Sequence, residues 1–125
     1  MSAAKPRLLI VDDDQAILDS LVERFAARDY VVYTANSGAT ALERADGVDV
    51  VLLDLQLPSG DGLWVLKRLE EIGSKVSVVV ITAHGTVGRA VEAMKLGAYD
   101  FLEKPFEAAR VEVAVARAWE RSQLI

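Results

Sequence analysis

The chain has 125 residues, of which 52% are hydrophobic and 26% charged. This balance predicts one folded domain with a real core and excludes an intrinsically disordered chain. The net charge of −5 argues against nonspecific nucleic-acid binding, and the lack of cysteine excludes disulfides and thiol chemistry. No apolar run approaches the roughly 20 residues that span a membrane. The polar segment Met1 to Pro6 is too short for a secretion signal, so we expect a cytoplasmic protein without membrane contact.

Short apolar runs alternate five times with helical patterns. The expected strands are Leu8–Val11, Tyr30–Ala35, Val50–Asp54, Val76–Thr82 and Tyr99–Leu102. The expected helices are Gln15–Arg28, a short one holding Ala41 to Ala45, then Leu63–Ile72, Val87–Met94 and Glu107–Leu124. Such alternation predicts an α/β fold with a parallel sheet, right-handed crossovers and helices on both faces. We therefore expect an α/β, doubly wound (βα)5 domain with a five-stranded parallel sheet.

Local signals add detail to three of these elements. Asp14 is placed to cap the first helix, because a carboxylate accepts hydrogen bonds from free backbone N–H groups there. Apolar positions in the fourth helix are Val87, Ala90, Val91 and Met94. Alternating apolar and polar residues in the fifth strand predict that it lies at an edge of the sheet.

Polar residues gather where the expected strands end. Asp12 and Asp13 follow the first strand, Asp54 and Thr82 end the third and fourth, and Lys104 follows the fifth. Sites in doubly wound sheets form beyond the carboxyl ends of the strands. We therefore expect these five side chains to converge there.

The residue types in this group indicate phosphoryl chemistry. Three neighbouring carboxylates repel one another, and a hard divalent cation such as Mg²⁺ relieves the repulsion. Lys104 offers a positive charge, and Thr82 a hydroxyl, to a phosphoryl group. Asp54 would be the nucleophile and would form an acyl phosphate, which requires no general base.

Four ordered motifs in the sequence carry a family resemblance. They are Val11-Asp12-Asp13-Asp14, the stretch from Leu53 through Asp54 and Pro58 to Gly62, Ile81-Thr82-Ala83 and Lys104-Pro105-Phe106. This set resembles the receiver domain of bacterial two-component response regulators, and the resemblance implies the flavodoxin-like strand order 2-1-3-4-5. The stretch from Thr82 to Phe106 is most similar to receivers of enhancer-binding transcriptional activators. The match covers nearly the whole chain, so residues 1–125 are expected to form one receiver domain, free-standing or excised from a longer regulator.

The resemblance implies a role for each site residue. Asp54 would accept a phosphoryl group from a phosphohistidine on a sensor histidine kinase. The metal set would be Asp12, Asp13, Asp54 and Gln56, with Asp12 acting mainly through bound water and Gln56 through its backbone carbonyl. Lys104 would hold a phosphoryl oxygen, its bond to Pro105 would be cis, and Thr82 would move toward the phosphoryl group. Phe101 would be the switch aromatic, acting by packing alone because it has no hydroxyl.

The expected output is a change of conformation that a downstream effector domain or protein reads, most simply to control transcription. The domain would catalyse only its own phosphorylation and dephosphorylation, and would not otherwise be an enzyme. A second apolar stripe on the last helix, Ala109, Val113 and Ala116, suggests a homodimer through the fourth helix, fifth strand and fifth helix. The alternative explanation for this stripe is that alanine is simply a good helix former.

Two other classes of protein share this architecture or this nucleophile. A phosphohydrolase of haloacid dehalogenase type needs an Asp two residues after the nucleophile, where this chain has Gln56, and it needs a cap insertion. A flavodoxin-like carrier needs a phosphate loop rich in Gly, Ser and Thr, where this chain has three aspartates. The acids after the first strand would also suit simple helix capping, the role we assign to Asp14. His84 is the single histidine and is interpreted as a loop residue.

Overall fold

The computed structural model describes residues 5–57, 62–83 and 87–124; the predicted turn at Pro58 to Asp61 and the predicted loop residue His84 lie outside these ranges. The strands are β1 (Arg7–Val11), β2 (Val31–Ala35), β3 (Val50–Asp54), β4 (Ser77–Thr82) and β5 (Asp100–Glu103). The helices are α1 (Gln15–Ala26), α2 (Gly38–Arg44), α3 (Gly62–Glu71), α4 (Val87–Lys95) and α5 (Ala108–Ser122). In the described ranges, no helix is long and apolar enough to cross a membrane.

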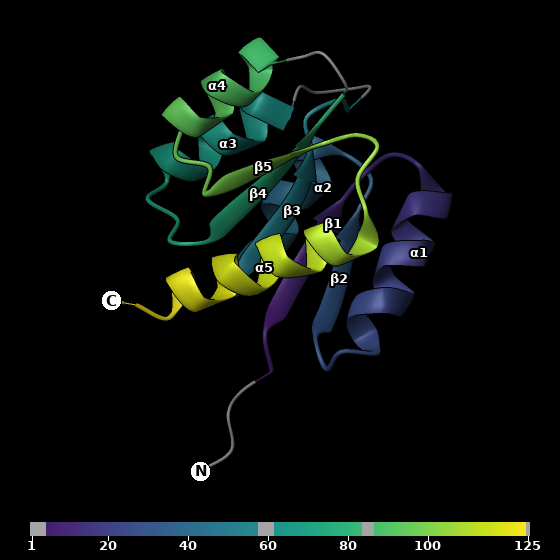
Figure 1. The fold of residues 1–125 in the computed structure, drawn as a ribbon. Coiled ribbons are helices and arrows are strands. Elements are labelled where there is room, and N and C mark those ends of the chain that lie inside the picture. Colours follow the sequence, from purple (N-terminus) through teal and green to yellow (C-terminus); the bar gives the residue numbers. More distant parts are fainter. Residues whose placement is uncertain (1–4, 58–61, 84–86, 125) are drawn as a thin grey trace.

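The five strands form one parallel sheet, as the sequence predicts, in the order β2-β1-β3-β4-β5 that the family resemblance implies. Helices α1 and α5 cover one face, and α2, α3 and α4 cover the other (Figure 1). The strand order reverses between β1 and β3, so the crevice at this switch point opens beyond the carboxyl ends of these two strands. The predicted edge position of β5 is confirmed.

The core is two apolar layers, one on each face of the sheet. Every residue of β3 and β4 is buried, which explains why both strands are almost continuously apolar in sequence. Alternate residues of each strand serve opposite layers, so Leu53 packs with α2 and α3 while Leu52 packs with α1 and α5. Burial on both faces therefore holds the ends of β3 and β4 in place.

Element boundaries differ from the prediction by one or two residues. Helix α1 ends at Ala26 rather than Arg28, because Asp29 adopts a left-handed backbone conformation with φ of 66°. Strand β5 begins at Asp100 rather than Tyr99, although the Tyr99 N–H still bonds the Val78 carbonyl at 2.7 Å. The last helix is Ala108–Ser122 rather than Glu107–Leu124.

The apolar pattern of α4 does not match the face that α4 buries. Of the predicted apolar positions only Ala90 is buried, whereas Val87, Val91 and Met94 are 65%, 49% and 40% exposed. The second buried residue within this helix is Ala93. Because both buried side chains are methyl groups, α4 packs closely through a narrow stripe and leaves its larger apolar side chains in solvent.

Candidate functional site

The parallel register brings the polar strand ends together. Val11 pairs with Leu53 and Asp54 with Ile81, so Asp12, Asp54 and Thr82 lie side by side at the carboxyl ends of neighbouring strands. Lys104 follows β5, and its N–H bonds the Thr82 carbonyl at 2.8 Å. The predicted convergence is therefore present, and it is produced by strands that are distant in sequence.

Three carboxylates form the centre of this site. Oxygen atoms of Asp12, Asp13 and Asp54 all lie within 4.8 Å of one another. Asp12 and Asp54 are buried, with 1% and 2% of their surface exposed, while Asp13 is exposed. Carboxylate oxygens on an open rim suit a hard divalent cation that keeps part of its water shell.

The cluster has a buried oxygen that the described residues leave without a hydrogen bond. Asp12 Oδ1 accepts from the Asp14 N–H at 2.9 Å, but Asp12 Oδ2 has no hydrogen-bond partner among the described residues. A buried polar atom of this kind is costly unless a ligand, water or ion completes it. The carboxylate oxygens of the three aspartates, together with this unpaired oxygen of Asp12, fit a site for a cation.

Lys104 supplies the positive charge at the cluster. Its Nζ lies 2.9 Å from Asp54 Oδ2 and 3.9 Å from Asp12 Oδ2. Burial lowers the pKa of Lys104, but the hydrogen bond to Asp54 and the charges of the three aspartates outweigh it and raise the pKa. The side chain therefore remains protonated and can hold an anionic oxygen.

Burial lowers the pKa of Lys104 but raises the pKa of Asp12, because in both residues it disfavours the charged form. Burial, with the charge of Asp54, raises the pKa of Asp12 to about 6, against the hydrogen bond from Asp14 and the charge of Lys104, which lower it. Without a cation the cluster therefore holds a proton more readily than an exposed aspartate does.

The remaining predicted residues surround this centre. Gln56 is exposed, and its N–H donates to Asp54 Oδ1 at 2.8 Å. Thr82 is buried, and its hydroxyl donates to the Leu102 carbonyl at 3.4 Å, a long bond that leaves it ready to change partner. Phe101 on β5 is 42% exposed and pairs with Val80, two positions before Thr82 on β4. The Lys104–Pro105 bond is cis, as the resemblance implies.

Asp14 does not belong to the cation site. Its Oδ1 accepts from the N–H groups of Ala16 at 2.9 Å and Ile17 at 3.4 Å, which confirms the predicted helix cap. Its main-chain N–H donates to Asp12, so it also helps to orient one of the cluster carboxylates.

Sequence reasoning assigned no role to Arg89, although the structure places it against the site. Its Nη2 donates to the carbonyl of Leu55, the residue after Asp54, at 3.2 Å. The available signal was a cation in the first turn of a helix, where the helix dipole disfavours positive charge.

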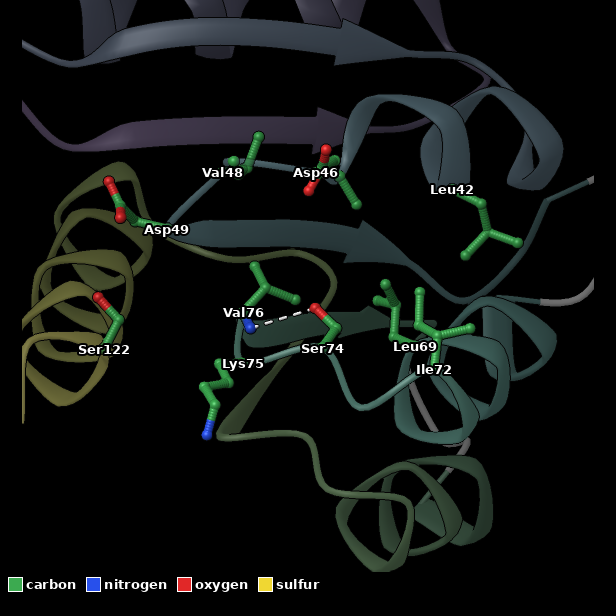
Figure 2. Close-up of a pocket in the computed structure, with 12 residues that line it drawn as sticks. Leu42, Asp46, Val48, Asp49, Leu69, Ile72, Ser74, Lys75, Val76 and Ser122 are labelled. Atoms are coloured by element: carbon green, nitrogen blue, oxygen red, sulfur yellow. Dashed lines mark hydrogen bonds between the residues drawn. The ribbon is translucent and has the colours of Figure 1, made fainter. Parts of the chain in front are cut away.

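A pocket of about 460 Å³ lies at the other end of the molecule, at the amino ends of β3 and β4 (Figure 2). Asp46, Asp49, Ser74, Lys75 and Ser122 contribute its polar side chains. Asp49 accepts from the Arg7 N–H and Ser74 from the Val76 N–H, so these two side chains stabilise the loops that border the pocket. The pocket is separate from the carboxylate cluster.

The fold and cluster define a class: a doubly wound α/β domain with three carboxylates and a lysine gathered at the carboxyl ends of its strands. Residues 8–116 match the response regulator receiver domain family, and the chain belongs to this family. Receivers are phosphorylation-dependent switches of two-component signalling, with histidine kinases as partners, rather than enzymes with an external substrate.

Similar proteins agree with this assignment. The chain is 37% identical to the regulatory protein AtoC of Escherichia coli over 90% of its length and 25% of that protein. It is 40% identical to the transcriptional regulatory protein FixJ of Azorhizobium caulinodans over 90% of its length and 54% of that protein. The chain thus spans between a quarter and about half of these curated relatives.

Solved structures show the same fold. The receiver domain of a putative Luxo repressor protein from Vibrio parahaemolyticus matches with a TM-score of 0.90 and 32% identity, covering 97% of this chain and 95% of that one. The beryllofluoride-activated NtrC4 receiver domain dimer matches with a TM-score of 0.85 and 36% identity, covering 93% and 98% of the two chains. The predicted fold and family are therefore confirmed.

Proposed function

We propose that Asp54 is the phosphoacceptor of this receiver. An Asp54 carboxylate oxygen attacks phosphorus, and the bond from phosphorus to the histidine nitrogen of the kinase breaks, which leaves the histidine neutral after protonation. The observation that supports this role is the pairing of buried Asp54 with Lys104 at 2.9 Å beside the unsatisfied Asp12 oxygen. Phosphoryl transfer needs a nucleophilic carboxylate, here Asp54, and a positive charge beside it, here the Lys104 ammonium. It also needs an oxygen that can help to bind a metal ion, here that of Asp12.

The cofactor that we propose is Mg²⁺. Asp13, Asp54 and the Gln56 carbonyl would bind it directly, with Asp12 acting mainly through water. When bound, the ion supplies positive charge that offsets the carboxylates and the phosphoryl oxygens. The same groups would let the domain catalyse its own phosphorylation and hydrolysis, and Gln56, an amide, lacks the acid–base group for general phosphohydrolase activity.

Phosphorylation would change the partners of three residues. Lys104 now bonds the Asp54 carboxylate and would transfer this bond to a phosphoryl oxygen, which carries more negative charge. Thr82 would exchange its long bond to Leu102 for a bond to the phosphoryl group. Phe101, half-exposed on β5, would then change its packing, and this change would transmit the signal.

The histidine kinase would approach along α1. A mainly apolar groove of about 640 Å³ is lined there by Ile17, Ser20, Ala83, Lys104 and Phe106, among others. Lys104 joins this groove to the carboxylate cluster, so a helix of the kinase lying in it would bring its phosphohistidine to Asp54. We propose this groove as the kinase-docking surface, in the cytoplasm.

The output would be read on the α4, β5 and α5 face. Exposed apolar residues there are Val87, Val91, Met94, Phe101 and Val113. A homodimer through this face would cover them, and NtrC4 is an example of a receiver that forms a dimer. The match covers only 25% of AtoC and 54% of FixJ, and both are regulatory proteins. We therefore propose that a further domain or partner carries a transcriptional output.

The dimer has its own measurement. Light scattering over a range of concentrations, with and without beryllofluoride, should show a dimer in one of the two states, and Val91→Asp should shift it toward monomer. A monomer in both states at every concentration would refute the dimer.

The experiment for the main proposal is the intact mass after incubation with acetyl phosphate. The wild type should gain one phosphoryl group with Mg²⁺ and none with EDTA, and Asp54→Asn should gain none in either. Asp46→Asn, an exposed aspartate in the pocket at the opposite end, is the matched control and should behave as wild type. Full labelling of Asp54→Asn would show that the site assignment is wrong.

A further inference from the structure

Arg89 links α4 to the backbone beside the phosphoacceptor. It lies in the first turn of α4, and its Nη2 donates to the carbonyl of Leu55 at 3.2 Å. Leu55 directly follows Asp54, and both residues are buried. One side chain therefore spans from a surface helix to the end of the central strand.

The strand end of this hydrogen bond is held firmly. The Leu55 carbonyl also accepts from the Gly62 N–H at 3.0 Å, and the Leu55 N–H donates to Ile81 at 2.9 Å. A Cβ on Gly62 would lie 2.5 Å from Leu55 Cα and 2.8 Å from the Asp54 carbonyl oxygen. The backbone of α3 thus packs directly against β3, and Leu55 cannot shift without moving both elements.

The other end of this hydrogen bond lies on α4, and α4 has few buried side chains to hold it. Within the described residues of α4, the buried side chains are those of Ala90 and Ala93, which contribute only methyl groups. The larger apolar residues Val87, Val91 and Met94 are exposed. Because the buried side chains of α4 are small, a charge-assisted hydrogen bond from Arg89 adds to the attachment of this helix.

We propose that Arg89 is a positioning residue that holds α4 in its unphosphorylated place through the Leu55 carbonyl. This inference rests on the proposed function, in which phosphorylation of Asp54 draws Thr82 inward. Helix α4 follows Thr82 in the chain, whereas Leu55 stays with β3. The hydrogen bond from Arg89 therefore joins α4, which would move with Thr82, to the end of β3, which would stay in place. Movement of Thr82 would strain this bond.

The consequence is that Arg89 sets the resting balance between the two states. With the bond intact, the unphosphorylated protein keeps α4 docked and its exposed apolar face in one arrangement. Without it, α4 samples the activated arrangement before any phosphoryl group is present.

Amide hydrogen exchange of residues 87–95 tests this role in both phosphorylation states. Arg89→Ala should speed exchange in the unphosphorylated protein by about tenfold, the size expected for loss of a charge-assisted hydrogen bond. Exchange in phosphorylated Arg89→Ala and phosphorylated wild type should coincide, because the bond is already broken in both. Lys95→Ala removes an exposed charge from the last turn of the same helix and should leave exchange unchanged in both states.

Two results would overturn the proposal: no change in the unphosphorylated Arg89→Ala protein, or an equal increase in both states, which a purely structural role predicts. If Arg89→Ala does not fold, Arg89→Lys provides the same comparison with a shorter donor, and an intermediate exchange rate is expected. Failure of the proposed function looks different, since neither wild type nor variants would then gain a phosphoryl group, while the effect on the resting protein would remain.

Discussion

Lys104 and Asp54, which are fifty positions apart in the chain, form an ion pair of 2.9 Å at the carboxyl end of the sheet. Asp54 is buried, so without this partner its charge would face two other carboxylates and little solvent. The ion pair therefore stabilises the resting site, and it also places the ammonium where a phosphoryl oxygen would form.

Lys104→Ala should separate metal binding from switching. Loss of the ammonium removes a positive charge next to the proposed ligands, so Mg²⁺ should bind equally well or a few-fold more tightly. The free energy of unfolding without metal should fall by about 1–3 kcal/mol, because a buried charge loses its partner. Calorimetric titration measures the first quantity and urea unfolding the second.

The matched control is Lys67→Ala, an exposed lysine on α3, which should change neither quantity measurably. Phosphorylated Lys104→Ala should also lack the change in amide exchange that phosphorylation causes in α4. If that change persists unaltered, Lys104 has no part in the switch.

Asp12 predicts an unusual dependence of stability on pH. Burial raises its pKa to about 6, above the ordinary value of 3.8, so the folded state retains a proton that the unfolded state loses. The metal-free protein should therefore become less stable as the pH rises from about 4 to about 6, and the loss should then level off. Urea unfolding at a series of pH values in EDTA measures this slope.

Asp12→Asn should remove this loss and make the metal-free protein more stable at pH 7 by about 1–3 kcal/mol. It should also weaken Mg²⁺ binding, since one oxygen of the cluster no longer carries charge. Asp19→Asn, on the exposed face of α1, is the control. An unchanged pH profile in Asp12→Asn would assign the titration to another group.

Two glycines predict opposite effects of the same substitution. Gly62→Ala would place Cβ 2.5 Å from backbone at Leu55, so it should destabilise the fold by about 2 kcal/mol or more and disturb the site. Gly88→Ala meets nothing within 4 Å and lies in α4, so it should be neutral or stabilise by up to about 1 kcal/mol. Thermal unfolding of both variants gives the comparison, and equal effects would contradict the close contact between α3 and β3.

Neighbouring residues of β5 should respond differently to truncation. Leu102 is buried at 3% exposure and Phe101 is 42% exposed, because successive side chains face opposite sides of the strand. Leu102→Ala should cost about 2–5 kcal/mol of stability and Phe101→Ala about 1 kcal/mol or less. Phe101→Ala should still accept a phosphoryl group in the mass experiment. A large loss of stability in Phe101→Ala would show that this side chain is part of the core rather than a surface switch.

Much of the site could be predicted from sequence because topology determines it. In a parallel sheet all carboxyl ends meet at one edge, so acids and a lysine that follow apolar runs must converge whatever their side-chain rotamers. Asp12, Asp13, Asp54 and Lys104 were predicted on this ground, and the structure brings them together. The cap at Asp14 was equally predictable, because it depends only on neighbouring residues.

The tertiary structure decided the contacts that depend on distances between elements. The Thr82 hydroxyl bonds Leu102 across the sheet, and Arg89 reaches Leu55 from another helix, choices that no periodicity in the sequence encodes. The burial of α4 was decided in the same way: its small alanines, rather than its larger apolar residues, face the core. Sequence therefore determined the order of elements and the residues at strand ends, whereas close packing determined which side chains meet, because that depends on the space left between helices and sheet.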